Sequence, residues 1–514
     1  MIRRIACSAL TLAAVLAPET AIARDVPVST TAELSTAITA AKPGDVIILA
    51  AGTYAMTGAT CSAAGTATDP IVVKSATPLG AKIKMDALEG FHVTAPNWHF
   101  EGLDVTGVCA DDSNCEHAFH VVGAATGFVL RGSRVFDFNA QVKVNSDKPS
   151  GTWITPHAGL IEGNEFGDSH PRNTSNPTTK VNIDTGDGWI VRANYIHDAH
   201  KGAGDGTSYA AFMKSGGKNG LFERNLVICS KDDTTGGTRI GLSFGGGGTD
   251  PAFCSPAFDS ATPCDPEHTG GTMRNNVIVN CSDVGIYLNK SKDTKILFNT
   301  LIATNGVDFR FASTTGEADG NVLASKIRGR DGGTFTAKTN LMDVVDFTSW
   351  YVDPMNGNLK KKGDLSSLLQ KVALRADVPD DYCARARSDG KLDLGALEHT
   401  LGDCDTTRPP LGGVTPGDAG ADASTGDASP GDASPDSTPT ADAVGFDSAL
   451  PDSGSCTERC GQPCTGSACP INEGQPTSSG CGCRVPTSNP RSGLLAIIGL
   501  GLAVAVRRAR ARRQ

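Results

Sequence analysis

The sequence predicts an all-β fold, a right-handed parallel β-helix with a short N-terminal capping helix, and three observations support this prediction. Glycine is frequent, at 60 of 514 residues, whereas aromatic residues make up only 5%. A pattern of short apolar strands with polar corners recurs along roughly the first 400 residues, and an amphipathic segment precedes it. Such a chain builds its core from many small repeated layers more readily than from a few long helices.

The segment 30–54 has the pattern of an N-terminal cap. Its apolar residues recur at helical spacing and predict a short amphipathic helix: Leu34, Ala37, Ile38 and Ala41. A turn is predicted at 43–45 and a buried strand at 46–49. A helix here would cover the open end of the first coil, whose backbone groups are otherwise exposed.

After the cap, each repeat has an apolar strand, a polar corner and two alternating apolar residues, as in GWIVRANYIHDA and GLFERNLVICSK. The predicted corners are Asp104, Ser133, Asn164, Asn194, Asn225, Asn276, Asn299, Asn321 and Asn340. Their steps are 29, 31, 30, 31, 51, 23, 22 and 19 residues; most fit one coil, and the longest fits a coil with a loop insertion. Stacked about 4.8 Å apart, the corner amides are expected to hydrogen-bond to one another and to adopt the left-handed conformation.

The first 23 residues have the pattern of a secretory signal peptide. Arg3 and Arg4 precede an apolar stretch, and Ala21-Ile22-Ala23 fits a cleavage site before Arg24. Export makes disulfides the expected state of the cysteines. Corner spacing and local loops predict four pairs, with Cys61 left as a free thiol: Cys109–Cys115, Cys229–Cys281, Cys254–Cys264 and Cys383–Cys404.

Changes in composition divide the sequence into five predicted parts: the signal peptide 1–23, the β-helix domain 24–400, an acidic linker 401–455, a Cys-rich segment 456–483 and a C-terminal segment 484–514. The linker is rich in Asp, Ala, Ser and Pro and cannot bury enough apolar surface to fold. The eight aspartates from Asp418 to Asp452 explain most of the net charge of −10, so the folded part is near neutral and nucleic-acid binding is not expected.

The tail combines the cysteines of GCGCR, an apolar run of 14 residues and five arginines. This combination resembles the C-terminal sorting signal of myxobacterial surface proteins. The resemblance implies cleavage near Cys481 or Cys483 by a sorting protease and retention at the cell surface, with membrane contact through this segment before processing. A plain membrane anchor is the alternative, although the run is shorter than the ~20 residues of a spanning helix. For the six late cysteines, disulfides are favoured over zinc because no His lies near them.

Four predicted strands follow corners and occupy equivalent positions in their coils; they start at Ala140, Ala211, Gly241 and Ile286. The alignment places on one outer column Lys143, Lys214, Phe244 and Asn289. A neighbouring strand adds Asn182, Asp184 and Asp187 nearby. Two pairs of histidines spaced by three are further candidates for a base or a metal ligand: His117 with His120 and His197 with His200. A structural role is favoured for all four, because strand faces alternate with period two.

The cap and the segment AAFMKSGGKNGLFERNLV resemble the family-six polysaccharide lyases, the chondroitinase B and alginate lyase group, which have the pectate-lyase-like solenoid. The resemblance implies that Lys214 is the base that removes the proton beside a uronate carboxylate, with Ca2+ and an arginine assisting. Two departures stand out. First, Phe244 stands where the family has its arginine, and the basic residue Arg239 lies five residues earlier. Second, the glutamates that bind calcium in the family are absent before Lys214, and Asp205 is the acidic residue of that segment.

The sequence therefore predicts a monomeric, cell-surface, carbohydrate-active protein that cleaves an acidic polysaccharide by β-elimination. The candidate catalytic residues are Lys214, Lys143 and Arg239. The candidate substrate contacts are Phe244, Asn289 and Asn182, and the candidate Ca2+ ligands are Asp184, Asp187 and Asp205. The alternative is a non-catalytic β-helix that binds glycan or serves as an adhesin or coat.

Overall fold

The computed structural model describes residues 24–388 and 390–408. The predicted signal peptide, nearly all of the predicted linker, the Cys-rich segment and the C-terminal segment lie outside these described residues. Within them, no helix is long and apolar enough to cross a membrane.

Three long parallel sheets make up most of the described chain. Sheet A contains β1 (Arg24–Val28), β2 (Asp45–Leu49), β5 (Ile71–Ser75), β8 (Trp98–Glu101), β11 (Val129–Arg131), β14 (Leu160–Glu162), β17 (Ile190–Arg192), β21 (Leu221–Glu223), β25 (Thr272–Arg274), β29 (Thr294–Leu297), β32 (Gly316–Asp319) and β35 (Thr336–Ala337). Sheet B contains β3 (Gly52–Met56), β6 (Ala81–Met85), β9 (Asp104–Gly107), β12 (Arg134–Phe136), β15 (Glu165–Gly167), β18 (Tyr195–His197), β22 (Leu226–Ile228), β26 (Val277–Val279), β30 (Thr300–Ile302) and β33 (Val322–Leu323). Sheet C contains β4 (Ala59–Cys61), β7 (Glu89–Val93), β10 (His117–Val122), β13 (Ala140–Asn145), β16 (Thr178–Asp184), β19 (Thr207–Lys214), β23 (Thr238–Phe244), β27 (Ile286–Asn289), β31 (Val307–Arg310) and β34 (Ile327–Arg330).

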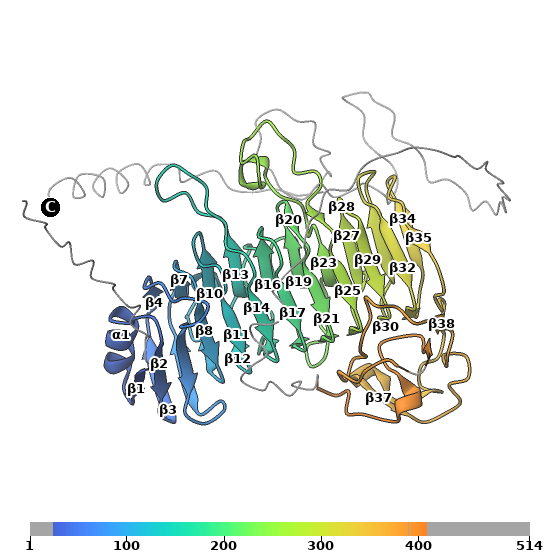
Figure 1. The fold of residues 1–514 in the computed structure, drawn as a ribbon, viewed down its shortest axis with the longest axis horizontal. Coiled ribbons are helices and arrows are strands. Elements are labelled where there is room, and N and C mark those ends of the chain that lie inside the picture. The colour runs from blue at the N-terminus through green and yellow to red at the C-terminus, as the bar shows by residue number, and fades with distance from the viewer. Residues whose placement is uncertain (1–23, 389, 409–514) are drawn as a thin grey trace, which may run out of the picture. The chain divides into compact units, whose positions relative to one another are not determined.

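The strand order identifies the fold. The chain passes through the three sheets in turn and then pairs with its previous coil, so that β14 pairs in parallel with β11 and β17. A small sheet of β20 (Gly217–Lys218), β24 (His268–Thr269) and β28 (Ser291–Lys292) adds a fourth side to three coils. Figure 1 shows the coils stacked one behind another. The predicted right-handed parallel β-helix is confirmed.

The N-terminal cap is helix α1 (Thr31–Thr39). Thr30 and Glu33 form a capping box that satisfies free backbone N–H groups at its start, and Leu34 and Ile38 are buried against the first coil. The strand that precedes this helix was not predicted from the sequence. It is β1, which pairs with β2, and the Arg24 guanidinium lies 2.7 Å from the Asp45 carboxylate.

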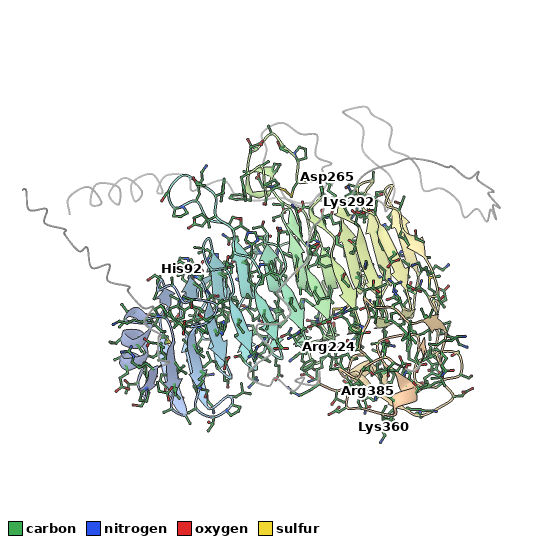
Figure 2. The ribbon with its side chains drawn as sticks, in the orientation of Figure 1. His92, Arg224, Asp265, Lys292, Lys360 and Arg385 are labelled. Atoms are coloured by element: carbon green, nitrogen blue, oxygen red, sulfur yellow. A yellow bond between two sulfur atoms is a disulfide. The ribbon has the colours of Figure 1, made fainter. Side chains whose placement is uncertain are left out.

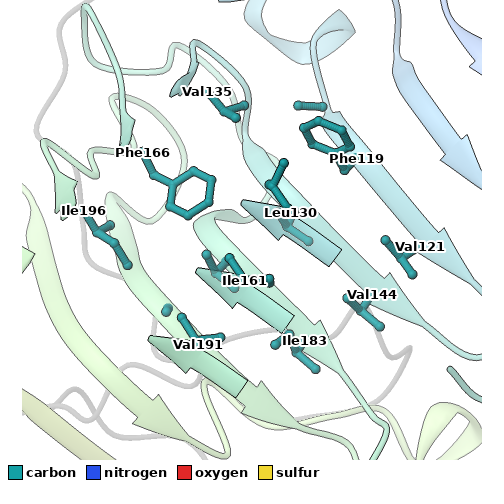
Figure 3. Packing of buried hydrophobic residues seen from close by; sticks show 14 of the residues in the cluster. Phe119, Val121, Leu130, Val135, Val144, Ile161, Phe166, Ile183, Val191 and Ile196 are labelled. Atoms are coloured by element: carbon teal, nitrogen blue, oxygen red, sulfur yellow. The ribbon is translucent and has the colours of Figure 1, made fainter. Parts of the chain in front are cut away.

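The core lies inside the coils, where equivalent apolar residues stack from one coil to the next (Figure 3). In sheet C, Val121, Val144 and Ile183 are in register, and each is essentially fully buried. In sheet A, Leu130 stacks on Ile161 in the same way. Burying each such side chain contributes about 1.5–3 kcal/mol, so the repeated columns stabilise the coil stack.

The predicted asparagine ladder is confirmed from Asn164 to Asn340. Each side-chain Nδ2 donates to the Oδ1 of the next corner, at 2.8–3.1 Å, along Asn164, Asn194, Asn225, Asn276, Asn299, Asn321 and Asn340. Ser133 begins the ladder, since its backbone N–H donates to Asn164 at 2.9 Å. The amides therefore satisfy one another inside the coil stack, where no water is available.

Two details of the corners differ from the prediction. The position equivalent to Ser133 is Leu103 rather than Asp104, because Asp104 pairs in register with Arg134, one residue later. The left-handed residue is also not the asparagine but the residue before it, as in Gly163 (φ 64°) and Ala193 (φ 52°). The amide side chain is thus selected for its ladder and not for its own backbone conformation.

All four predicted disulfides are present: Cys109–Cys115, Cys229–Cys281, Cys254–Cys264 and Cys383–Cys404. Cys61 is buried and, within the described residues, is the free cysteine, as predicted. The Cys229–Cys281 bond joins adjacent coils with a Cα–Cα distance of 4.8 Å, which agrees with the strand spacing of a parallel sheet.

The coils end earlier than the sequence suggested. The last strand of the three long sheets is β35, and the chain then folds against the outer face of sheet B. This later layer contains β36 (Tyr351–Asp353), β37 (Asn358–Lys361), β38 (Val372–Ala373) and β39 (Lys391–Leu392). Thr406 is buried and accepts a hydrogen bond from the Leu359 backbone, so residues 401–408, placed at the start of the predicted linker, belong to the fold.

Candidate functional site

Lys143, Asp184 and Lys214 meet on the outer face of sheet C, at the C-terminal ends of β13, β16 and β19. Asp184 pairs in register with Lys214, and Asn145, two residues beyond Lys143, pairs with Asp184. The Asp184 carboxylate contacts both ammonium groups, and its Oδ1 lies 3.3 Å from Lys214 Nζ. Each lysine side chain is 16% exposed, so both are reachable from solvent yet largely covered.

The two lysines also bind neutral groups of the site. Lys143 Nζ donates to Asn182 Oδ1 at 3.1 Å, and Lys214 Nζ donates to the Gly248 carbonyl at 2.8 Å. Two ammonium groups face one carboxylate, which leaves one positive charge among these three side chains. Such a centre suits an anionic ligand group.

The lysines perturb the acid between them. Burial by itself would raise the pKa of Asp184, but the charges of Lys143 and Lys214 outweigh burial and lower this pKa to about 2. Asp184 is therefore ionised at neutral pH.

This charge cluster lies at the floor of a cavity of about 450 Å³. Two loops border the cavity, residues 146–159 after β13 and residues 245–267 after β23, and both project from the same edge of the coil in Figure 1. Trp153 of the first loop stacks on Phe258 of the second, with ring centroids 4.6 Å apart and an interplanar angle of 15°. The residues that line the cavity are Lys143, Asn145, Ser146, Asp147, Lys148, Trp153, Asp184, Lys214, Ser215, Thr249, Asp250, Phe253 and Phe258.

A hydrogen-bonded chain ties the second loop to the charge cluster. Ser215 Oγ donates weakly to Asp184 Oδ1 at 3.4 Å and lies 2.9 Å from Thr249 Oγ1. Thr249 Oγ1 in turn donates to Glu267 Oε2 at 2.6 Å. Burial raises the pKa of Glu267 above its ordinary value. The loop that carries Thr249 is thus anchored at a fixed place beside Lys214.

The glycine run after β23 serves this arrangement. Gly245 has φ 100°, and a Cβ there would lie 1.9 Å from the Asn289 carbonyl oxygen, so no larger residue fits. The close approach lets the chain turn sharply out of sheet C, and the Gly248 carbonyl then reaches Lys214.

The predicted outer column is corrected by the register. Lys143 is in register with Asn182 and then Phe212, whereas Lys214 falls two positions further along, in the column of Asp184. A shift of two keeps both lysines on the outer face. Phe244 falls one position off and therefore points into the core, fully buried and stacked on His268 at 4.2 Å. It cannot contact a ligand on this face.

The other predicted substrate contacts have different places. Asn182 lies at the site, as the acceptor for Lys143. Asn289 is on the outer face of β27 but is 6% exposed, and its Nδ2 donates to the Gly246 carbonyl at 2.8 Å. Asn289 therefore supports the glycine turn.

Arg239 is not brought to the lysines. Arg239 lies near the start of β23 and pairs with Ser208 of β19. Ser208 is six residues before Lys214 on that strand. Its guanidinium is 1% exposed and is bound by the Cys229, Asp233 and Thr235 carbonyls and by the Asp233 carboxylate. These buried contacts keep Arg239, a candidate catalytic residue, away from the two lysines.

The three predicted calcium ligands are also separated. Asp205 lies before β19, at the opposite end of the strand from Lys214, and forms an ion pair with Lys201 at 2.6 Å. Asp184 is occupied by two ammonium groups, and Asp187 follows it in the next turn. Calcium requires six to eight oxygen ligands around one point. These three aspartates do not provide such a set of ligands.

The sequence did not indicate Trp153, Phe258 or Glu267 as parts of this site. The signal that could have found the last two was the 51-residue step between corners, which required a long loop, together with Cys254 and Cys264, which close that loop. Nothing in the spacing of the chain indicated that Trp153, in a different loop, would pack on it.

Removing the aromatic contact is expected to free the second loop. In Trp153→Ala the stacking partner of Phe258 is lost, which removes about 0.5–1.5 kcal/mol of aromatic pairing in addition to buried area. We expect chymotrypsin to cut faster after Phe253, which is 59% exposed in this loop. Trp153→Phe, which retains a ring, should be cut at nearly the wild-type rate. Equal cutting of wild type and Trp153→Ala would show that the Trp153–Phe258 contact does not hold the second loop in place.

The lowered pKa of Asp184 predicts a pH dependence of stability. A carboxylate whose pKa is depressed in the folded protein stabilises it above the ordinary value of 3.8, and this contribution is lost as the pH falls towards about 2. The melting temperature of wild type should therefore exceed that of Asp184→Asn above pH 4, and the difference should shrink between pH 4 and pH 2. A difference that is constant over this range would contradict the ion-paired state.

No known family model matches the sequence, and no curated protein is similar enough to match it. Solved structures similar to the chain include the pectate lyase Pel9A, at 14% identity and TM-score 0.49, covering 71% of this chain and 90% of that chain. A rhamnogalacturonan lyase is similar at 12% identity and TM-score 0.44, covering 72% and 92% of the two chains. The alginate lyase from Paenibacillus sp. str. FPU-7 is similar at 16% identity and TM-score 0.33, covering 62% and 99%.

At these identities the likeness concerns the fold alone. The strand order and register define a parallel β-helix, and the side chains of β13, β16 and β19 form the floor of a cleft on its sheet C, which is lined by three lysines and three aspartates.

Proposed function

We propose that this protein binds an acidic polysaccharide along the outer face of sheet C and cleaves it by β-elimination. The observation that supports the proposal is the pair of lysines around Asp184 on the floor of a cavity of about 450 Å³. Lys143 and Lys214 offer positive charge to a uronate carboxylate. The glycan itself is a uronate-containing chain.

In the proposed reaction Lys214 removes the proton from the carbon beside the uronate carboxylate. The electron pair forms a carbon–carbon double bond as the glycosidic C–O bond breaks, and the leaving oxygen takes up a proton from water. Lys143, held by Asn182 and Asp184, stabilises the carboxylate as negative charge develops on it.

A second function, glycan binding without cleavage, is favoured by one specific contact set. Lys214 is already held by Asp184 and by the Gly248 carbonyl, and a base must be released from such partners before it accepts a proton. In this case the protein is an adhesin or a surface coat. The two functions share one binding site and differ in the fate of the glycan.

One assay separates the two functions. The purified protein is incubated with alginate, chondroitin sulfate, dermatan sulfate and pectate, with and without calcium, while ultraviolet absorbance follows the unsaturated uronates that elimination forms. Binding to the same glycans is measured in parallel by affinity electrophoresis. Absorbance growth supports the lyase; binding without growth overturns it and supports the second function; neither signal overturns both.

We also propose that the protein is exported, processed at both ends and displayed as a monomer on the cell surface. The four disulfides of the described domain support export, because such bonds persist in oxidising compartments. The five-part organisation, with a sorting protease acting near Cys481 or Cys483, is part of this proposal. Mass spectrometry of the protein taken from the cell surface would give its two ends directly.

A further inference from the structure

A second polar cluster lies on sheet C, on the strands that precede β13. Glu89 is on β7, and His117 and His120 are on β10. One ligand atom from each of these three residues lies within 4.8 Å of the others. His92, labelled in Figure 2, lies beside the cluster, with its ring centroid 5.4 Å from that of His120. The proposed reaction uses none of these residues.

Both histidines point outward although they are three residues apart on one strand. His117 pairs in register with Glu89, and His120 with His92. Between the two histidines, Ala118 and Phe119 are both fully buried, so the alternation of faces is interrupted at this point. This irregularity brings two imidazoles to one carboxylate, which the period-two rule had argued against.

The hydrogen bonds of His120 define what its other nitrogen can do. His120 Nε2 lies 2.7 Å from Asn145 Oδ1, and the amide orientation is fixed because Asn145 Nδ2 donates to the Ser146 carbonyl. His120 Nε2 therefore carries the proton and donates it. In the neutral ring, Nδ1 then presents a lone pair.

That lone pair faces an anion. His120 Nδ1 is buried, makes no hydrogen bond of acceptable geometry, and lies 2.5 Å from Glu89 Oε2. Two electron-rich atoms at this distance repel each other unless a cation joins them. His117 Nδ1 lies 3.2 Å from Glu89 Oε1, and its Nε2 faces the Glu116 carboxylate at 3.9 Å.

We propose that Glu89, His117 and His120 bind one divalent transition-metal ion of the zinc class. Two imidazole nitrogens and one carboxylate oxygen are a donor set that such ions prefer, whereas calcium and magnesium prefer oxygen alone. Asn145 Oδ1 accepts a hydrogen bond from the outer ring nitrogen of His120, and the Glu116 carboxylate faces the outer ring nitrogen of His117 at 3.9 Å. Such partners are usual behind metal-binding histidines. Three protein ligands leave a position of the ion open to solvent or to a ligand.

The ion would lie one strand from the lysine cleft, because His120 pairs in register with Lys143. It adds positive charge to the same outer face. The proposal does not depend on β-elimination, and its test measures the metal alone.

The test uses the full-length protein after removal of metals with a chelator. Zinc binding is measured by equilibrium dialysis with elemental analysis, and cobalt is added separately to record the visible spectrum of a nitrogen–oxygen site. Because seven cysteines outside the described residues offer sulfur ligands, the quantity compared is the difference in bound zinc between wild type and variants.

We expect Glu89→Gln and His120→Ala each to bind one zinc ion fewer than wild type and to lose the cobalt nitrogen–oxygen bands. Asn145→Ala, which removes only the partner behind His120, should weaken this binding by about 10–100-fold. The control His170→Asn changes an exposed histidine paired with Asp112, and it should bind as wild type does. Each variant is checked for the wild-type melting temperature in chelator, and Glu89→Gln preserves the size of the side chain.

If the Glu89→Gln protein is folded and binds the same number of zinc ions with the same cobalt spectrum as wild type, the proposal is overturned. It is likewise overturned if wild type yields no nitrogen–oxygen cobalt spectrum, because the cluster is then an imidazolium–carboxylate pair only. Loss of the ion in Glu89→Gln and His120→Ala, with the ion retained in His170→Asn, supports the site.

Discussion

Replacing Lys214 with arginine is expected to lower the rate of β-elimination by about 10²–10⁴-fold, the usual contribution of a general base. Arginine retains the positive charge beside Asp184 but remains protonated at any working pH, so it cannot accept a proton. Glycan affinity should change only a few-fold. Lys214→Met, which removes both the charge and the base, should lose elimination and weaken binding as well. Rates are measured from the growth of unsaturated uronate absorbance, and affinities from glycan electrophoresis.

The matched control is Lys360→Met. Lys360 is exposed on β37, outside the cleft, and is labelled in Figure 2. Its replacement should leave both elimination and binding at the wild-type level. A Lys214→Arg protein that still cleaves at the wild-type rate would remove Lys214 from the role of base.

Asn225→Leu is expected to lower the free energy of unfolding by about 3 kcal/mol or more. The fully buried Asn225 side chain accepts two hydrogen bonds from Asn194, at 3.1 Å, and donates to the Val191 carbonyl and to Asn276, both at 2.9 Å. Leucine fills the space but leaves these partners without hydrogen bonds inside the coils, and each buried polar group left so costs about 1–3 kcal/mol. The midpoint of urea denaturation measures the loss.

Asn340→Leu provides the comparison at the last rung of the ladder. Asn340 is partly exposed, accepts from Asn321 at 2.8 Å and donates to the Ala318 carbonyl. Water can replace its bonds, so we expect a loss of about 1 kcal/mol. Equal losses for the two variants would show that the stacked amides do not act through burial.

The coil repeat and its cross-links were predictable because each depends on short sequence spacing. Asn194 and Asn225 are one coil apart, and the spacing alone predicted that their amides would meet. Cys229 and Cys281 follow their corners at nearly equal offsets, and the predicted bond is present. The residues of a β-helix contact their equivalents in the next coil, so a repeat in the sequence is a repeat in space.

The candidate site was predictable only in part. Lys143 and Lys214 were expected on one face, and they are, but their columns differ by two positions. Phe244 was expected beside them and is in the core, because an error of one residue in a strand reverses the face of its side chain. Arg239 was a candidate catalytic residue, and its guanidinium is instead bound by the Asp233 carboxylate and neighbouring carbonyls.

The sequence by itself determined the coil architecture, the asparagine ladder and the disulfides of the described domain, since these follow from local repeats stacked at one spacing. Only the tertiary structure decided which side chains form a site. The contact of Trp153 with Phe258, the Asp184 carboxylate between two lysines, and the meeting of Glu89 with His120 each join different strands or loops. Such contacts depend on strand register to within one residue and on how two irregular loops pack, and no repeat in the sequence encodes either.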